Sequence, residues 1–243
     1  MSFGLVCTVS TPTNVDIWFV AHFAKLLGHS RVFDLGFESA IRHHVFGGMC
    51  FGAALFVFWS EGARPGEHGV RGRIVTTLLG ATAGILLTFA LAAVISWLPP
   101  SRNPVLAQLY PAYLMENIND NSFPSQSTAL YAAVAAGIYS VNRIVGSALW
   151  FAVAGLVSLP RVFVGGHYPS DVLAGLLLGI LGYYLARTYL EPGLEPHIAR
   201  LFAQSGWPRA LVEVIVFVWI LQISVEFGEF VWVKGVLEHA LNR

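Results

Sequence analysis

The sequence predicts an all-α integral membrane protein, built as a bundle of about six transmembrane helices with an N-terminal amphipathic helix. Composition is the first observation behind this prediction, because 56% of the 243 residues are hydrophobic and only 12% are charged. A soluble domain carries about 25% charged residues, so this chain has too little charge to cover itself in water. The second observation is that the apolar residues are gathered in long stretches without charge, which a bilayer can bury.

The charge balance excludes several other classes of protein. Fourteen basic residues stand against fourteen acidic ones, so the formal net charge is zero. This excludes a nucleic-acid binder that relies on a basic surface, and the apolar composition excludes a disordered chain and a soluble globular enzyme. Cys7 and Cys50 are too few for a disulfide framework, and Cys50 lies in an apolar run, where it is expected to pack as a small hydrophobic residue.

The first predicted element is an amphipathic helix over residues 16–27, DIWFVAHFAKLL. Its apolar face would consist of Ile17, Val20, Phe23, Ala24 and Leu27. We expect this helix to lie in the membrane interface, with a tilted additional span as the alternative. Residues 1–44 would then form an N-terminal interfacial region.

Six apolar stretches follow and predict the bundle; they are 45–59, 74–98, 129–141, 144–159, 172–185 and 210–233. The second is free of charge from Leu78 to Leu98, which is long enough to cross about 30 Å of hydrocarbon. Three of the others are short and rich in Gly and Ala, which favours close packing between helices. We expect residues 45–190 to form the helical core and residues 191–243 to add a linker and an extra span.

The distribution of arginines predicts how the bundle faces the membrane, because cytoplasmic loops carry an excess of Lys and Arg. The loops at one end hold seven arginines, namely Arg64, Arg71, Arg73, Arg143, Arg187, Arg200 and Arg209. The loops at the other end, 99–128 and 160–171, hold only Arg102 and Arg161. We therefore expect these two loops outside the cytoplasm.

The loop 160–171 contains polar residues that a packed membrane bundle does not need. His167 and Asp171 are four residues apart, so they can lie on the same side of a helix that begins near Pro169. An aspartate bonded to one imidazole nitrogen fixes the tautomer and leaves the other nitrogen as a base or nucleophile. Since Arg161 offers a planar fork of donors for phosphate, the three residues predict phosphoryl transfer through histidine. The alternative is that Arg161 snorkels, His167 is interfacial and Asp171 caps a helix.

The loop 99–128 ends in a polar stretch that also fits an anion site. The stretch 122–127, SFPSQS, precedes an apolar helix, with serines as N-cap candidates and Pro124 suited to the first turn. Free backbone N–H groups at the start of a helix bind anions. Ordinary capping of a span is the alternative interpretation of the same residues.

Arg161, His167 and Asp171, embedded in PRVFVGGHYPSDVLAG, resemble the third signature motif of the type 2 phosphatidic acid phosphatase superfamily, the integral-membrane lipid phosphate phosphatases. SFPS at 122–125 resembles the start of that family's second motif, and LPPSRNP at 98–104 stands where its first, basic motif should be. The resemblance covers residues 74–186. It implies a six-helix bundle with a phosphatase site at the outer membrane face that needs no metal or other cofactor.

The resemblance also implies a role for each matching residue. His167 would be the nucleophile that becomes phosphorylated, Asp171 its orienting partner and Arg161 a phosphate ligand. The other residues expected to hold phosphate oxygens are Ser125, Gln126, Ser127 and Arg102.

Two departures from the family pattern bear on the chemistry. The second motif normally ends in a Gly or Asp followed by a histidine that protonates the leaving group, but here these positions are Gln126 and Ser127. The first motif normally supplies a Lys and an Arg-Pro pair, but here the pair is Asn103-Pro104, or requires Arg102 to serve one residue out of place, and the Lys position is Ile95. The nucleophile half of the site is therefore present, while the leaving-group half is not.

A missing general acid favours a substrate whose leaving group is already a stable anion. A general acid contributes about 10²- to 10⁴-fold to the rate of a reaction. Its loss is severe when the leaving group is an alkoxide and milder when the leaving group is a lipid phosphate. We therefore predict a lipid phosphatase or diphosphatase that acts on a polyprenyl diphosphate through a phosphohistidine. Two alternatives stay open, a phosphoryl or head-group transferase and a non-catalytic relic. A replacement acid would come from Glu116, Asp120, His43 or His44, unless these are solvated loop residues.

The remaining features concern partners and location. Glu226 and Glu229 are three residues apart and share a face of the predicted last span, so they meet a partner, line a polar crevice or lie at the interface. The histidines outside the motif show no ligand spacing, so no metal site is predicted. We expect a lipid phosphate substrate and membrane lipids as partners, with no nucleic acid and with protein partners left open. The expected location is a bacterial inner membrane, with the site on the periplasmic face.

Overall fold

The computed structural model describes residues 12–26, 29–32, 34–36, 44–62, 68–96, 122–203 and 206–226. No strand occurs in these segments, and the prediction of an all-α membrane protein is confirmed. The α-helices are α2 (Asn14–Ala24), α4 (His44–Glu61), α5 (His68–Ser96), α6 (Gln126–Val141), α7 (Arg143–Ala152), α8 (Leu159–Phe163), α9 (Pro169–Leu185), α10 (Glu191–Ala203) and α11 (Trp207–Ser224). Two π-helical segments, η3 (Val153–Ser158) and η4 (Ala186–Leu190), join α7 to α8 and α9 to α10.

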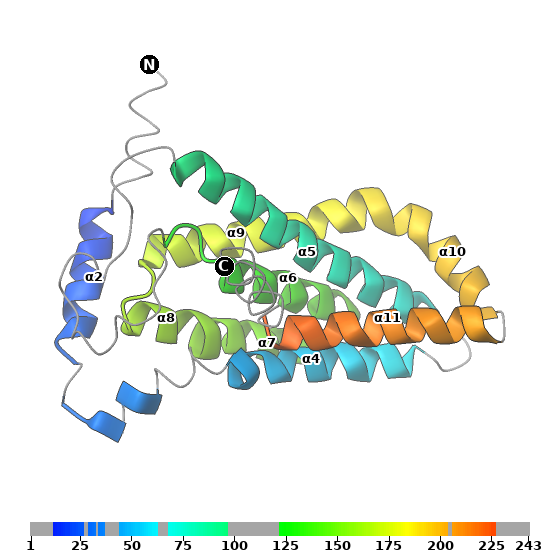
Figure 1. The fold of residues 1–243 in the computed structure, drawn as a ribbon, viewed down its shortest axis with the longest axis horizontal. Coiled ribbons are helices and arrows are strands. Elements are labelled where there is room, and N and C mark those ends of the chain that lie inside the picture. The colour runs from blue at the N-terminus through cyan, green and yellow to red at the C-terminus, as the bar shows by residue number, and fades with distance from the viewer. Residues whose placement is uncertain are drawn as a thin grey trace, which may run out of the picture.

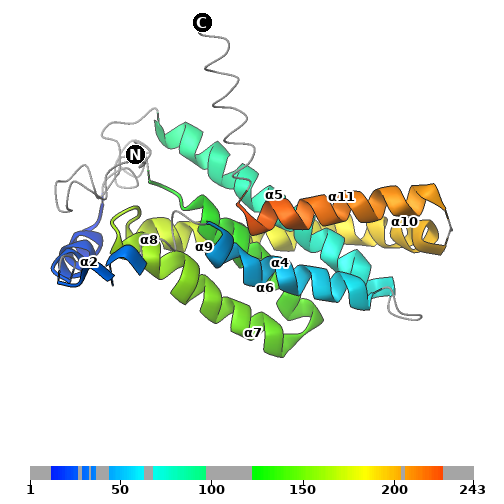
Figure 2. The same ribbon diagram turned by 60° about the horizontal axis from the view of Figure 1, so that its bottom comes forward.

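Among the described residues, four helical stretches are long and apolar enough to cross a membrane. They are Gly69–Val94, Arg143–Phe163, Pro169–Phe202 and Trp207–Ser224, and Gly48–Glu61 is a shorter apolar helix. The chain is thus an integral membrane protein, while the predicted count of six spans stays a prediction. Figure 1 shows the long helices running through the bundle, with α4 and α11 side by side, and Figure 2 shows the same pairing from another side.

Helix α6 lies in the centre of the bundle and packs against α5, α7 and α9. It is almost completely buried between Thr128 and Ile138. Small residues make this possible, because Ala129, Ala132 and Ala133 are fully buried and let the neighbouring backbones approach closely. The predicted span 129–141 lies within this helix, which has 16 residues.

Arg161 lies on a helix and not, as predicted, in a loop that begins at residue 160. The helix that begins at Arg143 continues through η3 into α8 and ends at Phe163. A proline inside an α-helix clashes with the carbonyl group four residues earlier. For Pro160 that carbonyl belongs to Leu156, which lies in η3, and the wider π-helical turn accommodates the ring.

The last predicted span, 210–233, is also corrected. Helix α11 ends at Ser224, and Glu226 has a φ of 52°, in the left-handed region that terminates helices. Glu226 therefore leaves the helix axis, and the predicted helix face that it shares with Glu229 does not form at this position. Glu229 and the residues after it lie outside the described part of the chain.

The N-terminal amphipathic helix forms as α2, two residues earlier than predicted, and lies across one end of the bundle (Figures 1 and 2). Val20 is buried, and Phe23 contacts the ring of Phe163 with centroids 5.7 Å apart. Ile17, which was predicted on the packed face, is 44% exposed and joins Trp18 on the outward side. Helix α2 is therefore apolar on two sides, one toward the bundle and one away from it.

The opposite end of the bundle carries a cluster of basic residues. Arg71 stacks on the rings of Trp59 and Phe202, at 4.8 and 4.2 Å from their centroids. Its guanidinium group lies 3.5 Å from the carboxylate of Glu213, which also pairs with Arg209 at 3.1 Å. These arginines belong to the set that the sequence assigns to the cytoplasmic side.

Candidate active site

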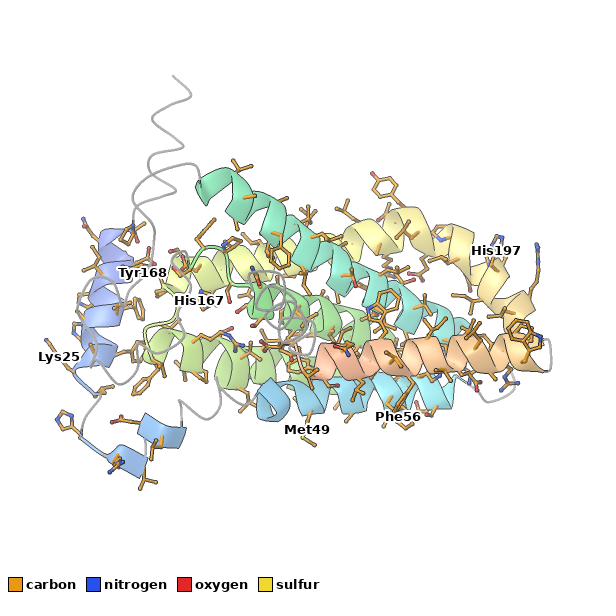
Figure 3. The ribbon with its side chains drawn as sticks, in the orientation of Figure 1. Lys25, Met49, Phe56, His167, Tyr168 and His197 are labelled. Carbon is orange, nitrogen blue, oxygen red and sulfur yellow. The ribbon has the colours of Figure 1, made fainter. Side chains whose placement is uncertain are left out.

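A short turn between α8 and α9 carries the predicted nucleophile. The N–H groups of Gly166 and His167 both donate to the carbonyl oxygen of Arg161, at 2.9 and 3.1 Å, so the chain folds back over the end of α8. Gly165 allows this turn because its φ of 81° lies in a region that other residues avoid. The turn places His167 at the end of the bundle that α2 covers, as Figure 3 shows for His167 and Tyr168.

The His167 imidazole is held by the main chain. Its Nδ1 lies 2.7 Å from the carbonyl oxygen of Ser122. A carbonyl oxygen can only accept, so Nδ1 donates the proton, and in the neutral ring the lone pair is on Nε2. The side chain of His167 is 21% exposed. Its burial is the largest influence on the pKa of His167 and lowers it, as does the charge of Arg161. The charges of Asp171 and Glu226 act in the opposite direction, but the pKa is lowered overall. The neutral, nucleophilic form is therefore favoured at neutral pH.

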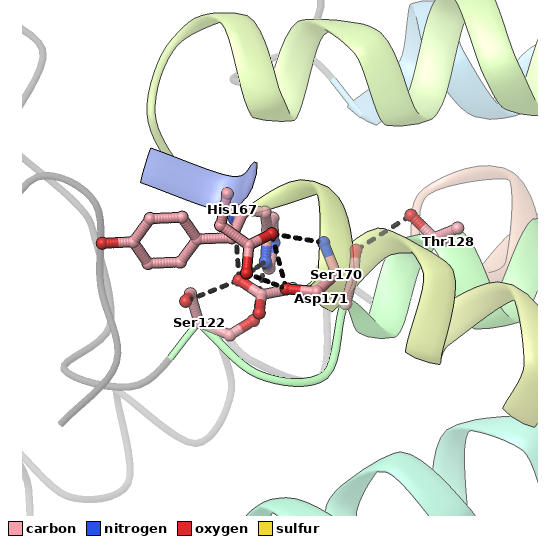
Figure 4. A network of polar contacts seen from close by, with 8 residues as sticks. Ser122, Thr128, His167, Ser170 and Asp171 are labelled. Carbon is pink, nitrogen blue, oxygen red and sulfur yellow. Dashed lines mark hydrogen bonds and ion pairs between the residues drawn. The ribbon is translucent and has the colours of Figure 1, made fainter. Parts of the chain in front are cut away.

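Asp171 reaches the imidazole through Ser122. The Asp171 Oδ2 lies 3.9 Å from Nδ1 of His167, which is too far for a hydrogen bond. It accepts instead from the hydroxyl of Ser122 and from the N–H of Tyr168, both at 2.8 Å. Figure 4 shows the resulting connection, in which Ser122 contacts Asp171 through its hydroxyl and His167 through its carbonyl group. The direct histidine–aspartate bond expected from the spacing is thus replaced by a bridge, and the sequence indicated Ser122 only as a candidate cap.

Arg161 binds a carboxylate that the family motifs do not include. Its Nη1 donates to the carbonyl oxygen of Val157 at 2.8 Å, and its Nη2 lies 2.7 and 2.9 Å from Oε1 and Oε2 of Glu226. The hydroxyl of Ser127 donates to Oε2 of the same carboxylate at 2.6 Å. The side chains of Arg161 and Glu226 are only 7% and 9% exposed. Glu226 is thus buried in an ion pair with Arg161.

The polar residues that precede α6 form its N-terminus. Ser125 is the N-cap residue, yet its hydroxyl pairs with that of Thr128 at 2.9 Å and caps no backbone N–H. The Ser125 N–H donates to the carbonyl oxygen of Asp171 at 3.1 Å and ties α6 to α9. Gln126 begins the helix and is exposed. The first-turn amides of a helix have no carbonyl partner within it, so an anion beside them is favoured.

Asp16 fixes α2 to the same region. Its carboxylate accepts from the N–H of Ser170 at 3.0 Å and from the Ser170 hydroxyl at 2.7 Å, at the start of α9. Burial raises the pKa of Asp16, but the hydrogen bonds from Ser170 and Thr13 together outweigh it, so the pKa is lowered. The charged carboxylate thereby holds α2 beside the turn that carries His167.

Part of the predicted site lies outside the described residues. Arg102 and the rest of the stretch that replaces the first motif belong to this part, as do the candidate acids Glu116, Asp120 and His43. His44 begins α4, but its side chain is not described. Within the described segments no three His, Cys, Asp or Glu side chains gather as a group that could hold a metal ion.

Comparison with known proteins agrees with the resemblance seen in the motifs. Residues 73–192 match the family model of the PAP2 superfamily. The bacitracin transport permease protein BcrC of Bacillus licheniformis is 43% identical over 68 residues, which are 28% of this chain and 33% of BcrC. A protein of Escherichia coli (strain K12) with the provisional name undecaprenyl-diphosphatase YbjG is 29% identical over 119 residues, 45% of this chain and 60% of YbjG.

These matches leave parts of each protein uncovered. Both relatives are matched over less than two thirds of their own length, and no solved structure gave a significant match. The family match contains Ser125, Arg161, His167 and Asp171, whereas Glu226 lies beyond its last residue.

Proposed function

Because residues 73–192 belong to the PAP2 superfamily, we propose that this integral membrane protein is a lipid diphosphatase that removes the terminal phosphate of a polyprenyl diphosphate through a phosphorylated His167. The observation that carries the proposal is the Nδ1–carbonyl hydrogen bond to Ser122, which leaves the lone pair of His167 on Nε2. The provisional name of YbjG, undecaprenyl-diphosphatase, supports the choice of a polyprenyl diphosphate.

The first step forms a bond between Nε2 of His167 and the terminal phosphorus. The P–O bond to the rest of the substrate breaks, and its electron pair stays with the lipid monophosphate. Because this leaving group is a stable anion, atoms and charges balance without a proton donor. A monophosphate ester would instead release an alkoxide, for which a general acid contributes about 10²- to 10⁴-fold. The serine at position 127 is thus compatible with a diphosphate substrate.

The second step regenerates the histidine. Water attacks phosphorus, the N–P bond breaks, and both protons of the water leave with dihydrogen phosphate. The ring returns to the neutral form with its proton on Nδ1, which Ser122 keeps oriented through both steps. Asp171 stabilises the positive charge that the ring carries in the intermediate, since its carboxylate lies 3.9 Å from Nδ1.

The phosphoryl group would be held between α6 and α8. Arg161 offers its guanidinium group at one side. The first-turn amides of α6, from Gln126 and Ser127, together with Ser125, would bind oxygens from the other side, and Arg102 would add a further positive charge. We place this site at the periplasmic face of a bacterial inner membrane, where the arginine distribution directs these loops.

The proposal is tested with purified protein in detergent micelles and a polyprenyl diphosphate carrying label in its terminal phosphate. We expect the wild type to release labelled inorganic phosphate and His167→Ala to release none above background. His197→Ala is the matched control, because His197 is an exposed histidine on α10 at the far end of the bundle (Figure 3). Equal release by His167→Ala would overturn the proposal, and label found on an acceptor instead of in free phosphate would show a transferase.

A further inference from the structure

The carboxylate of Glu226 lies on the guanidinium group that is proposed to bind phosphate. We propose that Glu226 occupies the anion site of Arg161 and Ser127 in the substrate-free protein and must be displaced by the phosphate of an incoming ligand. Glu226 would then set the affinity of the site for phosphate groups. This inference deepens the proposed function and rests on it for the identity of the ligand, but phosphate binding to the site can be measured without turnover.

The contacts of Glu226 are those expected of a bound anion. Arg161 donates from Nη2 to both carboxylate oxygens, at 2.7 and 2.9 Å, and Ser127 donates to one of them at 2.6 Å. Charge-assisted bonds of this length are the strong class of hydrogen bonds. Ser127 also belongs to the first turn of α6, where unpaired amides favour negative charge. A phosphate at this place would use the same donors.

The fold holds Glu226 in this position by packing at the end of α11. The hydroxyl of Tyr131, on α6, donates to the carbonyl oxygen of Ile223 at 3.1 Å. On the other side α4 approaches so closely that a Cβ atom at Gly48 would overlap the carbonyl group of Ser224. The left-handed φ of 52° at Glu226 is rare for a residue other than glycine and turns the chain away from the helix direction. Strained backbone of this kind is concentrated at functional sites.

Glu226 and a phosphate exclude each other at this site. A second anion beside the carboxylate would meet like-charge repulsion in surroundings where both partners are almost fully buried. The ligand must therefore replace the carboxylate on Arg161, and its apparent affinity is reduced by the free energy of breaking these contacts. The same competition lowers the affinity for the product, because Glu226 returns to Arg161 when phosphate leaves.

The experiment compares Glu226, just beyond the end of α11, with Glu213 on that helix. In Glu226→Gln the uncharged amide competes more weakly for Arg161, so we expect inorganic phosphate to bind about 10- to 100-fold more tightly than to the wild type. Glu213→Gln is the matched control, because Glu213 also pairs with arginine but lies at the other end of α11. Phosphate affinity is measured by isothermal titration calorimetry and by the rise in melting temperature of the purified protein with phosphate concentration.

Ser127→Ala is a second variant that leaves both charges in place. It removes a donor that Glu226 and a bound phosphate would share, so its phosphate affinity should change much less than that of Glu226→Gln. Phosphate affinity that is unchanged or weaker in Glu226→Gln, or a gain in Ser127→Ala as large as that in Glu226→Gln, would overturn the inference. The same holds if Glu226→Gln loses turnover without binding phosphate more tightly, since Glu226 would then act on a proton of the reaction.

The two proposals fail separately in this design. Tighter phosphate binding by Glu226→Gln, in a protein that hydrolyses no polyprenyl diphosphate, would support the occupied anion site and overturn the diphosphatase. Phosphate release that depends on His167, together with unchanged phosphate affinity in Glu226→Gln, would do the reverse.

Discussion

At the scale of single residues, hydrogen bonds decide which atom of each side chain in the site stays available to a substrate. Ser122 is the centre of the arrangement, because its carbonyl group fixes the tautomer of His167 and its hydroxyl satisfies Asp171. Asp171 therefore acts on the imidazole by charge and through Ser122. It also accepts the N–H of Tyr168 at the start of α9, so the same carboxylate caps this helix and is connected through Ser122 to the imidazole of His167.

This arrangement predicts a pH dependence. Neutral His167 is the attacking form, and its lowered pKa, caused mainly by burial and by the charge of Arg161, places the acidic limb of kcat/KM below pH 6.5. Asp171 raises this pKa, so Asp171→Asn should move the limb to still lower pH while reducing turnover. The measurement is the rate of phosphate release as a function of pH for both proteins with the same substrate. A limb that moves to higher pH in the variant would contradict the charge interaction.

At the scale of elements, the sequence predicts helices better than it predicts where they end. The apolar stretches predicted α4, α5, α6, α9 and most of the spans, because the length of an uncharged stretch and its small residues can be recognised in the sequence. The end of α11 was missed because Val225 and the residues after Glu226 continue the apolar pattern, and the contact that fixes Glu226 comes from Arg161, 65 residues earlier in the chain. Pro160 likewise indicated a loop, and only the π-helical turn before it explains a helix there.

The close packing of α6 against α9 gives a prediction for helix stability. A Cβ atom at Gly175 would overlap the carbonyl oxygen of Ser125. A Cβ atom at Gly155 would have no neighbouring atom within 4 Å. Gly175→Ala should therefore destabilise the protein by about 1–3 kcal/mol, the usual range for overpacking, and shift Ser125 at the start of α6. Gly155→Ala is the control and should be neutral. Melting temperatures in detergent decide the matter, and equal values for the two variants would contradict the predicted clash.

At the scale of the whole molecule, the described part of the bundle separates its charges by end. The His167 end carries Arg161, whose charge Glu226 balances, Asp16, which is fixed to Ser170, and Lys25, at the end of α2 (Figure 3). The opposite end carries the arginine cluster around Glu213. The sequence predicted this separation from loop counts alone, but it did not show that the charge of the outer arginine is internally paired.

The distribution of arginines also predicts the orientation of the bundle in the membrane. We expect the α2 end to face the periplasm, because loops with an excess of Lys and Arg are retained in the cytoplasm. Asn14→Cys and Glu195→Cys place a thiol on exposed positions of α2 and α10, in a background in which Cys7 and Cys50 are replaced by serine and alanine. In right-side-out spheroplasts a membrane-impermeant maleimide should label the first variant at once and the second only after permeabilisation. The reverse pattern would place the His167 end in the cytoplasm, where a periplasmic lipid diphosphate could not reach it.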